Sequence, residues 1–129
     1  MTINEPHIFE GEVNASGKAV GYHHRPNGRD IVYARMTRLT TGPDANGVYR
    51  GEVEVYNAVS STWIAKGLGS SFFPDSWSKD RVKDEILRAF SCQIRRNGQY
   101  WEGISPSGVV IGAYLDAAGN INTAFPIRQ

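Results

Sequence analysis

The chain has 129 residues, of which 40% are hydrophobic and 21% are charged, and these values are typical of one ordinary globular domain. A single cysteine, Cys92, excludes an internal disulfide and any two-cysteine zinc or redox motif. The net charge of +1 argues against a protein that coats nucleic acid through a globally basic surface. No segment has the apolar character of a secretory leader or a membrane span, so we expect neither in this chain.

The apolar residues mostly alternate as they do in half-buried strands. Strands are expected over residues 7–13, 18–23, 30–40, 48–56, 61–66, 100–104, 109–115 and 120–127. One amphipathic helix is expected over about 78–90, where Val82, Ile86 and Phe90 recur at helical spacing behind the candidate N-cap Ser78. The sequence therefore predicts an α+β fold, with one compact antiparallel-sheet domain over residues 1–129 and one main helix.

Two histidines, His7 and His23, lie in apolar segments on either side of a stretch rich in turn-forming residues, 14–18. A β-hairpin over this stretch would bring the two rings together. Imidazole has an unperturbed pKa of ~6.5, so one of two neighbouring rings can accept a proton near neutral pH while the other donates one. The pair is therefore a candidate for acid–base catalysis, although a lone histidine in a strand is more often a structural residue.

Basic residues are frequent between Lys18 and Arg38, a stretch that contains five of them and one acidic residue, Asp30. A local positive field attracts phosphate, but charges on a solvated strand face are an equally good interpretation. Arg25 in this stretch is a candidate substrate-binding residue. His24 follows His23 directly and should point to the opposite face of a strand, so we expect a substrate-side or structural role for it.

Four segments in order carry a resemblance to a known family: EPHIFEGEV at 5–13, GKAVGYH at 17–23, KGLGSSFFPDSWS at 66–78 and NINTAFP at 120–126. Together they resemble the EndoU family of endoribonucleases over essentially the whole chain. The form of the third segment is similar to the bacterial branch. Members of that branch are often the C-terminal toxin modules of contact-dependent and other polymorphic toxins.

The resemblance implies a compact α+β fold and cleavage of single-stranded RNA, usually beside uridine, with a 2′,3′-cyclic phosphate as product. By position, His7 and His23 match the family's catalytic histidines, Lys66 matches its catalytic lysine, and Thr123 matches the hydroxyl residue of its closing segment. The reaction takes a proton from the ribose 2′-OH, gives one to the 5′-oxygen and builds charge on the phosphoryl oxygens. Two imidazoles and a cation meet these needs.

The sequence does not decide which histidine is the base, and our working assignment is His7 as base and His23 as acid. Many relatives carry tyrosine where this chain has Phe125, which removes a hydroxyl but keeps a ring for stacking on a base. Phe125 is therefore a candidate substrate-binding residue, with core packing as the alternative. No metal or other cofactor is expected: some animal relatives depend on manganese, but no carboxylate cluster in this chain requires it.

The sequence interpretation is thus a metal-independent RNA transesterase. It would be secreted or delivered as part of a larger toxin and act on a tRNA or other single-stranded RNA in the cytoplasm of a target cell. A cognate immunity protein that covers the cleft of the two histidines is the expected partner. The alternatives are a catalytically weak or inactive RNA-binding module of the same fold, and an interaction domain whose histidines have no chemical role.

Overall fold

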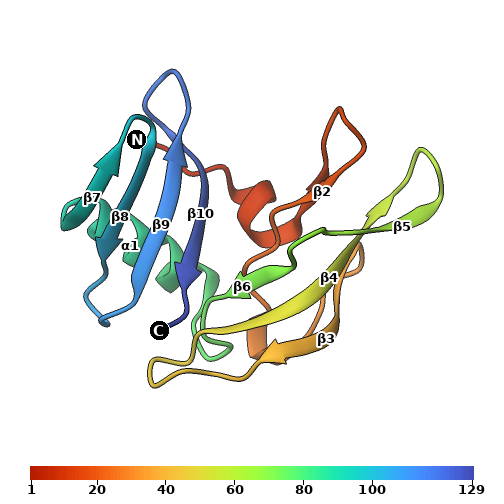
Figure 1. Ribbon diagram of the computed structural model, residues 1–129, viewed down its shortest axis with the longest axis horizontal. Coiled ribbons are helices and arrows are strands. Elements are labelled where there is room, and N and C mark those ends of the chain that lie inside the picture. Colours follow the sequence, from red (N-terminus) through yellow and green to blue (C-terminus); the bar gives the residue numbers. More distant parts are fainter.

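The computed structural model covers residues 1–129 and contains two antiparallel sheets, one α-helix and a short hairpin. In the C-terminal sheet the strand order is β10 (Ile121–Ile127), β9 (Val110–Leu115), β8 (Tyr100–Ile104) and β7 (Gln93–Asn97). The second sheet contains β3 (Ala34–Thr41), β4 (Tyr49–Asn57) and β5 (Thr62–Ala65), with β6 (Ser70–Phe72) also paired to β4. Figure 1 shows the two sheets side by side, with β6 and β10 facing each other near the middle of the molecule. This α+β architecture with one main helix confirms the predicted fold class.

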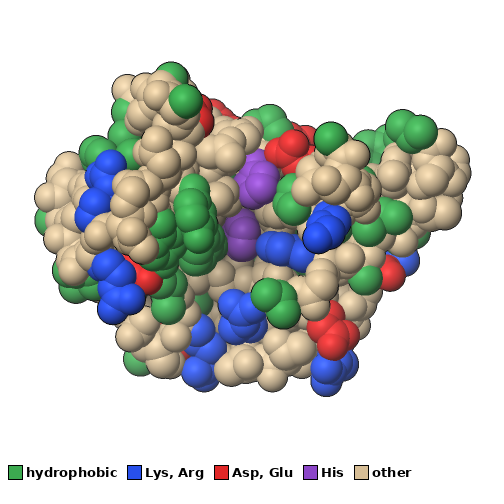
Figure 2. Space-filling model, turned by 45° about the horizontal axis from the view of Figure 1, so that its top comes forward, with side chains coloured by type: hydrophobic (Ala, Val, Ile, Leu, Met, Phe, Trp, Pro, Cys, Tyr) green, Lys and Arg blue, Asp and Glu red, His purple; other side chains and the backbone are tan.

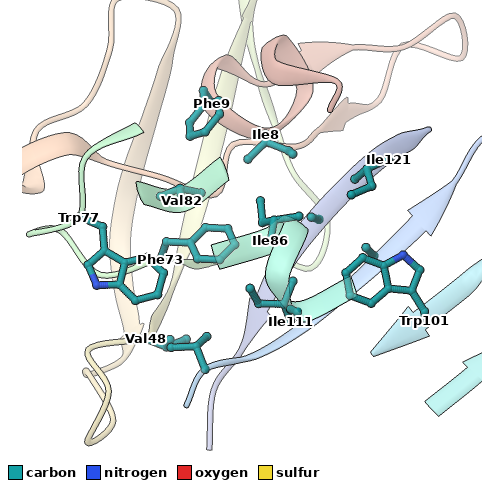
Figure 3. Close-up of a cluster of buried hydrophobic side chains, with 14 residues drawn as sticks. Ile8, Phe9, Val48, Phe73, Trp77, Val82, Ile86, Trp101, Ile111 and Ile121 are labelled. Carbon is teal, nitrogen blue, oxygen red and sulfur yellow. The ribbon is translucent and has the colours of Figure 1, made fainter. Parts of the chain in front are cut away.

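The helix α1 (Lys79–Phe90) covers one face of the C-terminal sheet. It begins where expected, because the hydroxyl of Ser78 accepts a hydrogen bond from the amide of Arg81 at 3.1 Å. Val82 and Ile86 point into a core that includes Trp101, and Figure 3 shows these side chains between the helix and the strands. A second buried cluster lies under the β3–β4–β5 sheet. No helix in the chain is both long and apolar enough to cross a membrane.

The segment around His7 is helical, and the prediction of a strand over 7–13 is wrong for most of its length. Pro6–Glu10 forms a single π-helical turn, η1, and only Glu12–Val13 is strand, β1. Pro6 sets the first position of the turn, and Gly11 ends it with a φ of 71°. Ile8 and Phe9 are both buried, which neighbouring residues of a strand with one covered face cannot achieve.

The other deviations from the predicted strands also have local causes. The strand expected over 18–23 shortens to β2 (Ala19–Val20), because Gly21 and Tyr22 take left-handed φ values of 80° and 67°. The strand expected over 30–40 begins only at Ala34. Two strands were not predicted, because all of β7 is exposed and all of β6 is buried, so that neither alternates.

Candidate active site

The two histidines are brought together by the backbone of the residues that follow β2. The amide of Tyr22 donates to the carbonyl of His7 at 2.9 Å, and the amide of His23 donates to the carbonyl of Ile8 at 2.7 Å. Gly21 permits this approach, because a Cβ at that position would lie 2.0 Å from the His7 carbonyl oxygen. The β1–β2 hairpin therefore returns the chain to η1, but the two bonds are made beyond the hairpin, by Tyr22 and His23, after the backbone has turned through the left-handed residues Gly21 and Tyr22.

His7 and His23 line one cleft of about 350 Å³ between the two sheets. Figure 2 shows histidine side chains in a hollow at the centre of the molecule, with basic side chains beside them and hydrophobic ones on the opposite wall. The lining includes no carboxylate and consists of His7, Val20, Gly21, His23, Arg50, Lys66, Leu68, Gly69, Ser70, Ser71, Thr123 and Phe125. Such a surface is suited to an anionic ligand.

His23 is 5% exposed, and its ring is oriented by a single hydrogen bond. Nδ1 lies 2.7 Å from the carbonyl oxygen of Ser71 in β6. Because a carbonyl oxygen can only accept, Nδ1 carries the hydrogen, and Nε2 of the neutral ring keeps its lone pair without a protein partner. Burial lowers the pKa of His23 well below its ordinary value, and the nearby Lys66 ammonium lowers it further.

The ring of His7 is held by a carboxylate instead. Nδ1 lies 3.3 Å from a carboxylate oxygen of Glu12, the first residue of β1. Burial lowers the pKa of His7, but Glu12 opposes this effect by stabilising the imidazolium. The protein thus favours the neutral form more strongly for His23 than for His7, since only His7 has a carboxylate beside it.

Lys66 directly follows β5, is partly buried and lines the cleft. Nζ donates to the carbonyl of Gly21 at 3.1 Å and to the hydroxyl of Ser70 at 2.8 Å. An ammonium has three donors, so one is left for a ligand. Burial lowers the pKa of Lys66 to about 8, with a further contribution from the charge of Arg50, and the side chain remains mostly cationic at neutral pH.

The chain matches the family model described as bacterial EndoU nuclease over residues 2–128. It belongs to the bacterial EndoU nuclease family. It is also 33% identical over 124 residues to a protein of Bacillus cereus named "Toxin". That match covers 93% of this chain but only 21% of the relative, so the chain spans about a fifth of the relative's length. No solved structure matches the chain.

In this EndoU nuclease, the closing segment supplies the wall of the cleft opposite Lys66. Thr123 and Phe125 alternate with the buried Ala124 along β10, so that both face the cleft. The Phe125 ring lies 5.9 Å from the His23 ring, centroid to centroid. It also packs over Gly112 of β9, where a Cβ would lie 2.8 Å from a Phe125 ring carbon. Phe125 therefore packs on the sheet and also lines the cleft.

His24 and Arg25, both expected as substrate-binding residues, lie outside the cleft of the EndoU domain. His24 is 1% exposed and its Nε2 lies 2.8 Å from the carbonyl oxygen of Trp77, so it is a buried structural residue. Nε of Arg25 donates to Asp30 at 2.8 Å. Charge and position in the sequence suggested a role for both residues, but Trp77 holds His24 and Asp30 holds Arg25, and neither residue lines the cleft.

Arg50 lines the cleft and was not identified from the sequence. Arg50 lies in β4, where buried and more exposed residues alternate, and this pattern shows only that Arg50 is on the more exposed face of the strand. Its proximity to the histidines depends on the pairing of β4 with β6, which is a long-range contact. No group of three or more His, Cys, Asp or Glu residues is placed to hold a metal ion, and the charged or titratable side chains that line the EndoU cleft are those of two histidines, one lysine and one arginine.

Proposed function

We propose that this EndoU domain is an endoribonuclease that cuts single-stranded RNA without a metal ion. The 2′-OH would attack the adjacent phosphorus, and the products would be a 2′,3′-cyclic phosphate and a free 5′-OH. The observation that carries the proposal is one carboxylate-free cleft that holds His7, His23 and Lys66, with Nδ1 of both rings anchored. The same geometry supports a proton acceptor, a proton donor and a cation for the phosphoryl oxygens.

We assign His23 as the base and His7 as the acid, which reverses our working assignment from the sequence. His23 is neutral with its Nε2 lone pair free, because Nδ1–H donates to Ser71 and burial lowers the pKa. His7 has Glu12 beside it, and the negative charge of a bound phosphodiester would raise its pKa further toward the protonated form. The acid therefore becomes charged when substrate arrives.

Lys66 and Thr123 complete the proposed reaction centre. The one uncommitted donor of the Lys66 ammonium would bind a non-bridging phosphoryl oxygen, whose charge grows in the transition state. The hydroxyl of Thr123 has no side-chain partner within the protein and can bind the same phosphate or a base edge. Phe125 would stack on the base beside the cut, and uridine is the base we propose.

The cleavage test uses single-stranded RNA in the presence of EDTA. We expect the wild type to cut and the His7→Ala, His23→Ala double variant to be at least a thousandfold slower, since each proton-transfer group contributes roughly 10²–10⁴ in rate. Arg38→Ala, which removes a cation outside the cleft, should cut normally. An RNA with 2′-deoxyuridine at the cleavage site should resist, because its nucleophile is missing. Equal cleavage by the wild type and the double variant would refute the proposal.

We further propose that the domain acts as a toxin in the cytoplasm of a target cell and is neutralised by a cognate immunity protein. The relative named "Toxin" and the family membership support the toxin role. The cleft presents two cations and no carboxylate, so we expect an immunity protein that places acidic side chains over it. Expression in a susceptible cell, followed by sequencing of the cleaved RNA ends, identifies the target. A toxic effect that persists in the double histidine variant would show that the toxicity does not come from RNA cleavage at this cleft, and absence of toxicity in the wild type would contradict the toxin role.

A further inference from the structure

Arg50 presents unused hydrogen-bond donors to the cleft. Arg50 in β4 pairs in register with Ser71 in β6, and the carbonyl of Ser71 orients His23, the proposed base. The backbone of Arg50 is therefore separated from His23 only by strand β6. Nη2 donates to the carbonyl of Leu68 at 3.1 Å, and this is the only hydrogen bond of the guanidinium. A guanidinium has five N–H donors, so four remain available to a ligand. Fixed in this way, the group can bind a phosphate through two parallel hydrogen bonds.

The charge of Arg50 is not neutralised within the protein. Neither Arg50 nor Lys66 has a carboxylate within 4.0 Å, although ion pairs join Arg25 to Asp30, Arg35 to Glu54 and Arg38 to Glu52. The two free cations are close enough for the charge of Arg50 to lower the pKa of Lys66. Like charges held together destabilise each other, and a polyanionic ligand would relieve that repulsion.

The two cations are anchored at different places in the cleft. Nζ of Lys66 donates to the carbonyl of Gly21, whereas Arg50 donates to the carbonyl of Leu68, a residue that is 92% exposed. The charge of Lys66 lowers the pKa of both histidines, whereas the charge of Arg50 lowers, of the two, only the pKa of His23, and by less than Lys66 does. A phosphate between the two histidines would therefore lie nearer to Lys66 than to Arg50. We propose that Arg50 forms a second phosphate-binding subsite, which holds the RNA phosphate next to the one that is cut. This inference rests on the proposed function, because it assumes that the ligand is RNA.

The kinetic test compares substrates that differ only in a second phosphate. Uridylyl-adenosine has one phosphate, and the same dinucleotide with an added 5′- or 3′-phosphate has two. We expect Arg50→Ala to lower kcat/KM about tenfold more for one of the two-phosphate substrates than for uridylyl-adenosine, because only that substrate loses a charge-assisted contact. Arg50→Lys should recover part of the difference. Arg38→Ala, which removes an arginine outside the cleft, should not discriminate among the substrates.

A binding measurement separates this inference from the proposed activity. The probe is a uridine-containing RNA oligonucleotide with one 2′-deoxyuridine at the cleavage site, titrated at several salt concentrations. Loss of one phosphate contact should reduce the slope of log affinity against log salt by about 0.7 in Arg50→Ala. An unchanged slope, or an equal kinetic loss on all three dinucleotides, would overturn the subsite. Failure of the wild type to cut any RNA would refute the proposed function, and the salt slope would still test the subsite.

Discussion

The His23 amide donates to the carbonyl of Ile8 at 2.7 Å, one residue after Tyr22 makes the equivalent bond to His7. Two consecutive backbone bonds therefore fix the relative position of the histidines, and side-chain contacts only orient the rings. These two bonds fix the distance between the backbones of His7 and His23, so that only the side-chain torsions of the two histidines remain free.

Gly21→Ala should disrupt these two backbone bonds. The added Cβ would lie 2.0 Å from the His7 carbonyl oxygen, and the residue would also keep a left-handed φ of 80°. We expect a loss of roughly 2–5 kcal/mol in the free energy of unfolding and a large loss of kcat in the protein that still folds. Chemical denaturation and single-turnover cleavage measure the two effects.

Gly17→Ala is the matched control for this substitution. Gly17 also has a left-handed φ, 77°, but a Cβ there meets no atom within 4 Å. The control should lose only the conformational term, about 1–2 kcal/mol, and keep its kcat. Equal effects of the two substitutions would show that the close approach of Gly21 to His7 is unimportant.

Glu12→Gln should identify the acid through the pH dependence of kcat/KM. The Glu12 carboxylate raises the pKa of His7, so its removal should lower that pKa. If His7 is the acid, it must be protonated, and the descending limb of the profile should move to lower pH. The ascending limb, which reports deprotonation of the base His23, should stay in place. Movement of the ascending limb instead would mean that His7 is the base.

Phe125→Ala should lower kcat/KM for RNA by roughly 5- to 150-fold, which corresponds to the ~1–3 kcal/mol of one stacked base. Ile127→Ala is the control for lost packing, because Ile127 follows on the same face of β10 but does not line the cleft. Phe125→Tyr should keep the rate and increase the preference for uridine, since it restores a hydroxyl beside the base. A loss in Ile127→Ala equal to that in Phe125→Ala would assign Phe125 to packing alone.

Glu85→Gln should destabilise the fold without changing the chemistry. Glu85 is 4% exposed, and its carboxylate accepts from the Ser105 hydroxyl and from both the amide and the hydroxyl of Ser107. An amide group accepts at only one of its two atoms, so we expect a loss of about 2 kcal/mol in the free energy of unfolding. The exposed Glu52→Gln should leave the free energy of unfolding nearly unchanged, because solvent screens its ion pair with Arg38. A lower kcat for folded Glu85→Gln would connect the 105–108 turn to the cleft.

Elements with strong periodicity could be predicted from the sequence, and those without it could not. The helix, its Ser78 cap and the last three strands lie where amphipathic patterns and turn residues indicate. The segment around His7 looks apolar and strand-like, but Pro6–Glu10 forms a helical turn that buries both Ile8 and Phe9. β7 pairs with β8 although all of its residues are exposed, and a fully exposed strand leaves no hydrophobic pattern in the sequence.

The sequence by itself determined the fold class, the family and the identity of the candidates His7, His23, Lys66 and Thr123, because these depend on residue types in a fixed order. Only the tertiary structure decided which neighbours belong to the cleft. It brings Arg50 in through the pairing of β4 with β6, and it turns His24 into the core. It also orients the His23 ring through the carbonyl of Ser71 in β6, a contact between residues far apart in the sequence that is set by packing, whereas the partner of His7, Glu12, lies in the neighbouring strand β1.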